Sequence, residues 1–298
     1  MNATEFERLA REGHNRIPIV LETAADLDTP LSVYLKLAGT PYSYLLESVV
    51  GGERFGRYSI IGLPARCTLK FFGNRYRVLL DGKISEEGES EDPLGFVESF
   101  GKRFKAAPIS FPLRFFGGLV GYFGYDAVRY IEPKLAKTEK KDTLGTPDIL
   151  LMASEELAVF DNLSGKLYLI VYADPGQANA FERAHERLDE LRRKLRAPVR
   201  IPEYTPKAEL PEAQSEIGEA AYLDAVDKSK RYIVDGDIMQ VQISQRITLP
   251  FDAHPSISTG RCARSTPPPT CSISISRTSI SSAPPPRSWS GRSRTRSP

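Results

Sequence analysis

Alternation of apolar and polar residues constrains the fold of this chain more than any other feature. Residues 68–72 (Thr-Leu-Lys-Phe-Phe) and 75–80 (Arg-Tyr-Arg-Val-Leu-Leu) have the period of a β-strand and are joined by Gly-Asn, a typical hairpin turn. Residues 156–160 and 166–172 form a second such pair around a polar turn. We therefore expect antiparallel β-sheet through the front of the chain.

After residue 177 the period becomes that of a helix. One amphipathic helix is predicted from apolar residues at three- and four-residue steps: Phe181, Ala184, Leu188, Leu191 and Leu195. A second helix is expected over residues 219–234, ended by Gly236. Alternation across residues 239–243 then predicts a half-buried strand that opens a second sheet.

These patterns divide the chain into four parts. Residues 1–197 form an N-terminal region, and the proline-punctuated residues 198–218 are a linker. Residues 219–255 begin a second region. In residues 256–298, Ser, Thr, Pro and Arg account for 32 of 43 positions and Leu is absent, which predicts a disordered tail.

Charge and composition exclude several classes of function. The tail holds seven arginines and no acidic residue, which leaves 33 basic and 38 acidic groups in the first 255 residues. A weakly acidic body argues against nucleic acid as the partner. No signal peptide or membrane-spanning run is visible, so we expect a cytoplasmic protein without a membrane partner.

Neither a metal site nor a catalytic histidine can be assigned. The chain has three cysteines and three histidines: Cys67, Cys262, Cys271, His14, His185 and His254. None of them has the spacing of a zinc site, and three cysteines are too few for a disulfide framework.

Two segments could carry function. The glycine-rich residues 116–126 invite comparison with a phosphate-binding loop, but they lack Gly-Lys-Ser/Thr and are rich in aromatic residues. We favour a structural role, with glycine where a backbone or a ring packs closely. At residues 45–48 (Leu-Leu-Glu-Ser), a carboxylate and a hydroxyl follow an apolar run. They could bind an ammonium group, although a turn or helix cap is the commoner role of such a serine.

Four motifs in order identify a family resemblance: Leu-Leu-Glu-Ser at 45–48, Gly-Arg-Tyr-Ser-Ile-Ile-Gly at 56–62, the glycine-rich motif at 117–126, and Gly-Asp-Ile-Met-Gln-Val-Gln-Ile-Ser-Gln-Arg at 236–246. Together they closely resemble anthranilate synthase component I over residues 1–255. In that family the serine of the first motif helps to bind tryptophan, the feedback inhibitor. The resemblance therefore implies a tryptophan site at Ser48 and Glu47, with Arg57 and Ser59 as further candidates.

The resemblance also implies a fold and a reaction. The expected fold class is α+β, a truncated antiparallel sandwich of two sheets with outer helices. The family converts chorismate and glutamine or ammonia to anthranilate and pyruvate, with Mg²⁺ and a glutamine amidotransferase subunit (component II) as partner. Its catalytic and metal-binding residues lie beyond residue 255, so we assign none here and expect this chain to be inactive.

The departure from the family after His254 and Pro255 has the signature of a frameshift. Joining the third base of each codon to the first two bases of the next permits Asn-Pro-Ser-Pro-Tyr-Met across residues 265–271, a segment that the family contains. The same shift permits a chorismate-enzyme signature, Phe-Val-Gly-Ser-Ser-Pro-Glu-Val-Leu-Val, across residues 280–290. We therefore interpret residues 256–298 as translated out of frame.

Two other functions remain open from the sequence. Aminodeoxychorismate synthase component I uses the same substrate, although the residues of the first two motifs favour anthranilate synthase, the enzyme of the tryptophan branch. The chain could also be a non-catalytic module that senses tryptophan or binds a partner. The coding DNA distinguishes these hypotheses, because an intact second reading frame indicates a damaged enzyme.

Overall fold

The structure is a computed structural model of the whole chain. It forms two compact units, residues 1–201 with 255–298, and residues 202–254. The residues that the structure describes are 1–48, 57–108, 113, 115–136, 142, 144–201, 212–250, 270–275 and 280–283.

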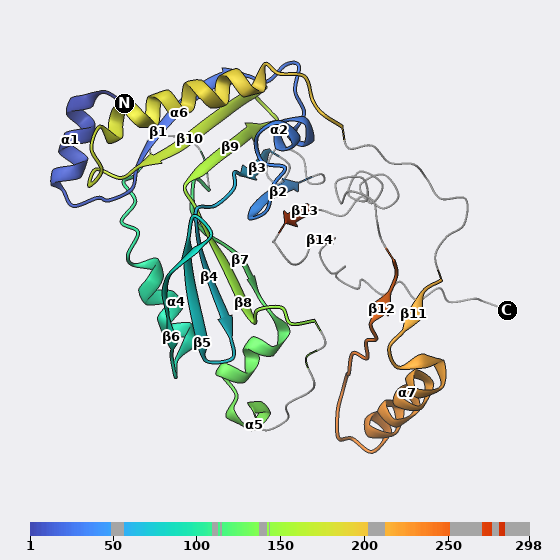
Figure 1. Cartoon of the computed structure of the whole chain (residues 1–298). Helices are drawn as coiled ribbons and strands as arrows, with labels where there is room; N and C mark the ends of the chain where they lie inside the picture. The colour runs from blue at the N-terminus through green and yellow to red at the C-terminus, as the bar shows by residue number, and fades with distance from the viewer. Residues whose placement is uncertain are drawn as a thin grey trace. The chain divides into compact units, whose positions relative to one another are not determined.

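A seven-stranded antiparallel sheet organises the first unit, with strand order β1-β10-β9-β3-β2-β13-β14 (Figure 1). Its strands are β1 (Ile17–Ala24), β2 (Ser43–Ser48), β3 (Tyr58–Gly62), β9 (Glu156–Asp161), β10 (Lys166–Ala173), β13 (Thr270–Ile275) and β14 (Ile280–Ala283). The predicted β9–β10 hairpin is confirmed.

The centre of this sheet is buried on both faces. On β10, Leu167 and Leu169 belong to the main apolar core, whereas Tyr168 and Ile170 belong to a second apolar cluster. Since successive side chains of a strand point to opposite faces, each face of β10 packs against its own layer. This explains why the strand has an almost continuous apolar sequence.

Helices cover the main core, which lies between them and the sheet. Figure 1 shows α6 running along β1 and β10. The helices of this layer are α1 (Ala3–Arg11), α2 (Pro30–Leu37) and α6 (Ala180–Leu195). Of the five apolar positions that the sequence predicts on α6, Phe181 is partly buried and four are buried: Ala184, Leu188, Leu191 and Leu195.

A five-stranded antiparallel sheet, ordered β6-β5-β4-β8-β7, has its own apolar cluster. Its strands are β4 (Cys67–Phe72), β5 (Arg75–Leu80), β6 (Lys83–Glu89), β7 (Gly118–Phe123) and β8 (Ile149–Ser154). The predicted β4–β5 hairpin is confirmed, with Gly73 at φ 57° in its turn. The remaining helices of this region are α4 (Pro93–Gly101), the 3-10 helix η1 (Tyr125–Tyr130) and α5 (Pro133–Ala136). The α+β class with two large antiparallel sheets and outer helices is confirmed.

The second unit contains α7 (Gly218–Val234), which confirms the predicted helix, and a two-stranded ribbon of β11 (Gln214–Ser215) and β12 (Ile247–Thr248). The predicted strand at 239–243 is wrong: these residues form no strand, and Met239 is 99% exposed. Alternation stabilises a strand only where a partner strand and a covering layer exist. In the described part of this unit, neither lies beside these residues, and α7 buries no side chain.

Two short segments differ from the predicted pattern of linker and tail. Strand β11 lies within the expected linker of residues 198–218, most of which falls outside the described residues. Strands β13 and β14 lie within the tail expected to be disordered, and β13 pairs with the outer edge of β2. Alternating isoleucines in Thr-Cys-Ser-Ile-Ser-Ile suit a strand, and an open sheet edge offers unpaired backbone groups to such a segment.

Candidate functional site

The predicted effector residues lie at the end of β2. Register places Glu47 between Ser59 of β3 and Cys271 of β13, so the carboxylate extends from the interior of the sheet rather than from a loop. Ser48 is the last residue of β2. The expected turn or helix cap is thus replaced by a strand end.

Glu47 combines partial burial with an uncompensated charge. Burial raises the pKa of its carboxyl group above the usual value, because desolvation disfavours the ionised form. Within the described ranges, Glu47 makes no ion pair. A half-buried acceptor of this kind gains from a ligand that brings a positive charge.

Arg57 and Ser59, the further candidates, already have structural partners. Arg57 donates from Nε and Nη2 to the two carboxylate oxygens of Asp161, at 3.0 and 2.8 Å. Ser59 is fully buried, and its Oγ accepts a hydrogen bond of 3.2 Å from Asn162 Nδ2. The two contacts connect the start of β3 to the end of β9 and to the turn that follows it. Direct contact of either residue with an effector stays a prediction.

The pairing of Arg57 with Asp161 was not predicted from the sequence. Asp161 is buried, and the hydrogen bond from Arg57 is the main reason that its pKa lies below the usual value. The same carboxylate accepts from the backbone of Leu163 at 3.1 Å and of Ser164 at 3.4 Å. The Asp-Asn start of this turn was the available signal, since these residues often bind backbone two residues ahead.

Tyr44 explains the last glycine of the second motif. It lies opposite Gly62 in the β2–β3 register, and a Cβ atom on Gly62 would lie 2.0 Å from its ring. The Tyr44 hydroxyl is 2.7 Å from Ser154 Oγ of β8. Gly62 thus permits a ring to cross β3 and join the strand that carries the predicted effector residues to the second sheet.

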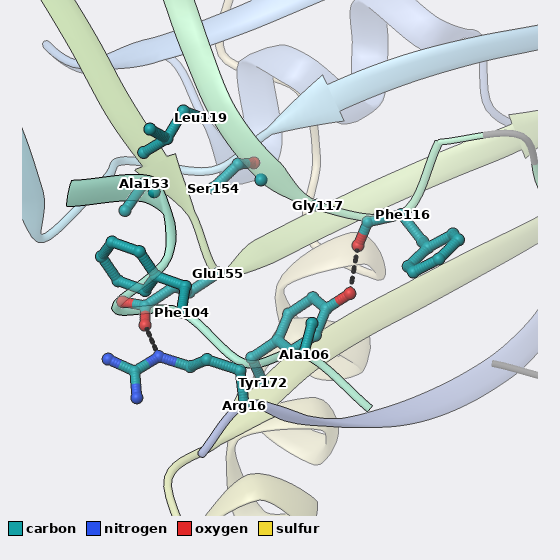
Figure 2. Close-up of a pocket in the computed structure, with 12 residues that line it drawn as sticks. Arg16, Phe104, Ala106, Phe116, Gly117, Leu119, Ala153, Ser154, Glu155 and Tyr172 are labelled. Carbon is teal, nitrogen blue, oxygen red and sulfur yellow. Dashed lines mark hydrogen bonds and ion pairs between the residues drawn. The ribbon is translucent and has the colours of Figure 1, made fainter. Parts of the chain in front are cut away.

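The glycine-rich motif has the predicted structural role, because Gly117 and Gly121 leave no room for a side chain. A Cβ atom on Gly117, at φ 149°, would lie 2.8 Å from the Tyr172 ring, and one on Gly121 would lie 1.8 Å from the Leu150 carbonyl oxygen. Figure 2 shows the Tyr172 hydroxyl donating to the carbonyl of Phe116 at 2.9 Å. This motif also lines a cavity of about 220 Å³.

The described residues supply no evident metal site. Within the described ranges, no group of three His, Cys, Asp or Glu side chains could hold a metal ion. They therefore do not provide the set of oxygen donors that Mg²⁺ requires. Among the same residues, no helix is long and apolar enough to cross a membrane.

Comparison with known proteins shows the family of this chain. The model of the chorismate binding enzyme family matches residues 58–292. The chain belongs to this family. The matched range extends into the basic tail. Relatives named anthranilate synthase component 1 include that of Pseudomonas aeruginosa, 50% identical over 264 residues, which are 86% of this chain and 53% of the relative. That of Neisseria meningitidis serogroup C is 54% identical over 250 residues, 83% of this chain and 50% of the relative.

A solved structure supports the fold. Anthranilate synthase component I from Streptococcus pneumoniae matches with a TM-score of 0.57 and 23% identity, over 81% of this chain and 52% of that protein. The chain thus spans about half the length of these family members.

Proposed function

We propose that this chain is the N-terminal part of an anthranilate synthase component I, a cytoplasmic enzyme that in complete form converts chorismate and ammonia to anthranilate and pyruvate. The identity of 50% to the Pseudomonas aeruginosa relative over 86% of this chain carries the proposal. A glutamine amidotransferase subunit would supply ammonia. In the complete protein Mg²⁺ would bind the substrate carboxylate through residues beyond 255.

Tryptophan, the proposed inhibitor, suits the end of β2 chemically. Its ammonium group would form an ion pair with the Glu47 carboxylate. This pairing would offset the free-energy cost of keeping a half-buried carboxylate ionised. Arg57, by contrast, is already paired with Asp161 and would hold the neighbouring strand in place. Ser48 enters this proposal through the family motif that it completes.

The out-of-frame interpretation makes the proposal testable at the level of the gene. We expect that correcting one or two bases near the codons for Pro255 and Ser256 yields a continuous family-like chain. Resequencing this region provides the test. Stop codons in the shifted frame within the tail would contradict the interpretation.

Activity of the corrected enzyme tests the reaction itself. The corrected protein should form anthranilate, detected by its fluorescence, from chorismate, Mg²⁺ and ammonium. Formation of p-aminobenzoate precursor instead would assign the chain to the aminodeoxychorismate branch. If the corrected protein folds but forms neither product, the result would support the hypothesis of a non-catalytic module.

Regulation is tested in the same corrected enzyme. Replacing Glu47 by Gln or Ser48 by Ala should weaken tryptophan inhibition about tenfold or more, because a charged hydrogen bond is lost, while kcat stays unchanged. Glu22→Gln is a matched control, since Glu22 lies on β1 and pairs with Lys166 at the surface. Unchanged inhibition in both variants would remove these residues from the site. The uncorrected chain should bind tryptophan weakly, because the family segment Pro-Tyr-Met that closes the site is absent.

A further inference from the structure

A cavity of about 220 Å³ lies where β7, β8 and β10 approach one another. Figure 2 shows the aromatic side chains of Phe104 and Tyr172 among its lining residues, whereas the ring of Phe116 points away from Phe104 and Glu155. Ala153 and Leu119 add aliphatic surface, and Glu155 supplies a carboxylate. The cavity therefore presents mostly apolar walls with one ion pair, formed by Glu155 and Arg16.

The volume limits what can bind. A cavity of about 150 Å³ lined by apolar residues accommodates benzene. The present cavity is larger by about one short substituent, so a single aromatic ring with a small polar group fits it.

The aromatic walls are held open by the glycine-rich motif. Tyr172 is fixed by its hydrogen bond to the carbonyl of Phe116, and Gly117 has no Cβ atom to displace the ring. Phe104 packs edge-on against Phe100, with ring centroids 5.4 Å apart. Both rings thus have fixed neighbours, so the cavity does not need a ligand to form.

The charges beside the cavity favour a cation. Arg16 donates from Nε to Glu155, and its Nη1 lies 3.3 Å from Asp174. One guanidinium therefore faces two carboxylates. Arg16 and Glu155 line the cavity, whereas Asp174 lies behind Arg16, and the three groups together carry one net negative charge. All three side chains are at least two-thirds buried, so water screens this net charge only in part.

We propose that this cavity binds a single-ring aromatic amine, with the ring between Phe104 and Tyr172 and the ammonium group on Glu155. Aromatic faces attract cations, and Arg16 already lies over Phe104 with its guanidinium carbon 5.2 Å from the ring centroid. Glu47 is not among the described residues that line this cavity. The site is therefore independent of the proposed tryptophan site.

Titration of the 298-residue chain with benzylamine, followed by ligand-observed NMR and calorimetry, tests the proposal. A ligand of this size should bind with a dissociation constant of about 1 mM. Glu155→Gln should weaken benzylamine roughly tenfold, because a charged hydrogen bond is lost, and leave uncharged benzyl alcohol unchanged. Ala106→Phe, which adds a ring at an exposed position of the lining, should block both probes.

Glu156→Gln provides the matched control. Glu156 is the next residue and also pairs with an arginine, but its partner is Arg187 and it does not line this cavity. Thermal melts establish that each variant folds, and Ala106→Phe remains informative if Glu155→Gln does not. Benzoate binding as tightly as benzylamine, absence of benzylamine binding, or equal weakening by Glu156→Gln would each overturn the proposal.

Discussion

Asp161 illustrates how one buried charge can join distant parts of a sheet. Its side chain is 2% exposed, yet it accepts two hydrogen bonds from Arg57 and two from backbone amides of its own turn. Four acceptor contacts satisfy a group whose burial is otherwise costly. The residue thereby fixes β3 against the β9–β10 hairpin.

Replacing Asp161 by Asn should destabilise the fold by about 2 kcal/mol, because breaking a buried pair leaves the partner charge uncompensated. The exposed fraction of Arg57, 34%, keeps this value below that of a fully buried pair. Urea unfolding measures the difference. Asp189→Asn is the control, since Asp189 pairs with Arg192 at the surface and its loss should cost less than about 0.5 kcal/mol.

The contribution of Asp161 to the stability of the fold should decrease as the pH falls. Its pKa in the folded state is lowered below the usual 3.8, chiefly by Arg57. The stabilisation is therefore present above the unfolded pKa and is lost as pH falls through the folded pKa. Unfolding curves should show the difference between the original chain and Asp161→Asn shrinking below pH 4 or so. A difference that grows on acidification would contradict this assignment.

Gly62 should tolerate no larger residue, because Tyr44 occupies the space over its backbone. A methyl group there would lie 2.0 Å from the ring, so Gly62→Ala should cost about 3 kcal/mol through overpacking. Adding Tyr44→Leu to Gly62→Ala should recover part of this loss in chemical denaturation. Gly73→Ala is a contrasting variant, since no atom lies within 4 Å but its φ of 57° is strained. Failure of the double variant to recover stability would remove Tyr44 as the cause.

Among the helices, α6 and α7 differ in how they are stabilised. Four apolar residues of α6 are buried against the main core, whereas α7 buries none. Isolated helices are marginal in water, so packing decides their stability. The two helices should therefore respond differently to the same substitution.

Leu188→Ala in α6 should destabilise the first unit by about 3 kcal/mol, because it leaves a cavity in the core. Leu223→Ala in α7 should change stability by less than about 0.5 kcal/mol, since this leucine is exposed. Thermal unfolding of the two variants makes the comparison. Equal destabilisation would show that α7 packs more tightly than its exposure indicates.

The same contrast explains which elements could be predicted from the sequence. The two hairpins and α6 carry their signal locally, as a period of two or of 3.6 residues beside turn residues. The expected strand at 239–243 has the same alternation but lacks a neighbour, and alternation alone does not supply one. Local patterns therefore predicted elements whose partners lie close in sequence.

The site was less predictable because its contacts join remote segments. Leu-Leu-Glu-Ser was singled out by resemblance, and β2 does end there. Arg57 and Asp161 are separated by 104 positions, and Tyr44 and Ser154 by 110. No periodicity connects such pairs. The tight fit of Gly62 likewise becomes visible only once β2 and β3 are in register.

The chain as a whole combines a unit with a large core and a unit without one. Residues 1–201 contain all the buried apolar clusters found among the described residues. In residues 212–250, several large apolar side chains are exposed, including Met239 and Val234. Exposed apolar surface on this scale is expected to bind another surface or to promote aggregation.

Limited proteolysis should therefore remove residues 202–254 first. Cleavage requires local opening, which costs least where few apolar groups are buried. Mass spectrometry should find early cuts in this segment and a resistant fragment that ends near residue 201. Early cuts within α6 or β10 would contradict this order.

Finally, the chain as given should form no anthranilate, with glutamine or with ammonia, even when an amidotransferase subunit is added. The reaction requires a metal and acid–base groups held in fixed geometry, and binding energy alone does not replace them. The described residues gather no candidate metal ligands, and the chain spans about half the length of its relatives. The assay is anthranilate fluorescence with chorismate, Mg²⁺ and ammonium, with the frame-corrected protein as positive control. Turnover above a no-enzyme blank, from protein whose mass confirms an end at Pro298, would place the catalytic groups within this chain and overturn the proposed division of the enzyme.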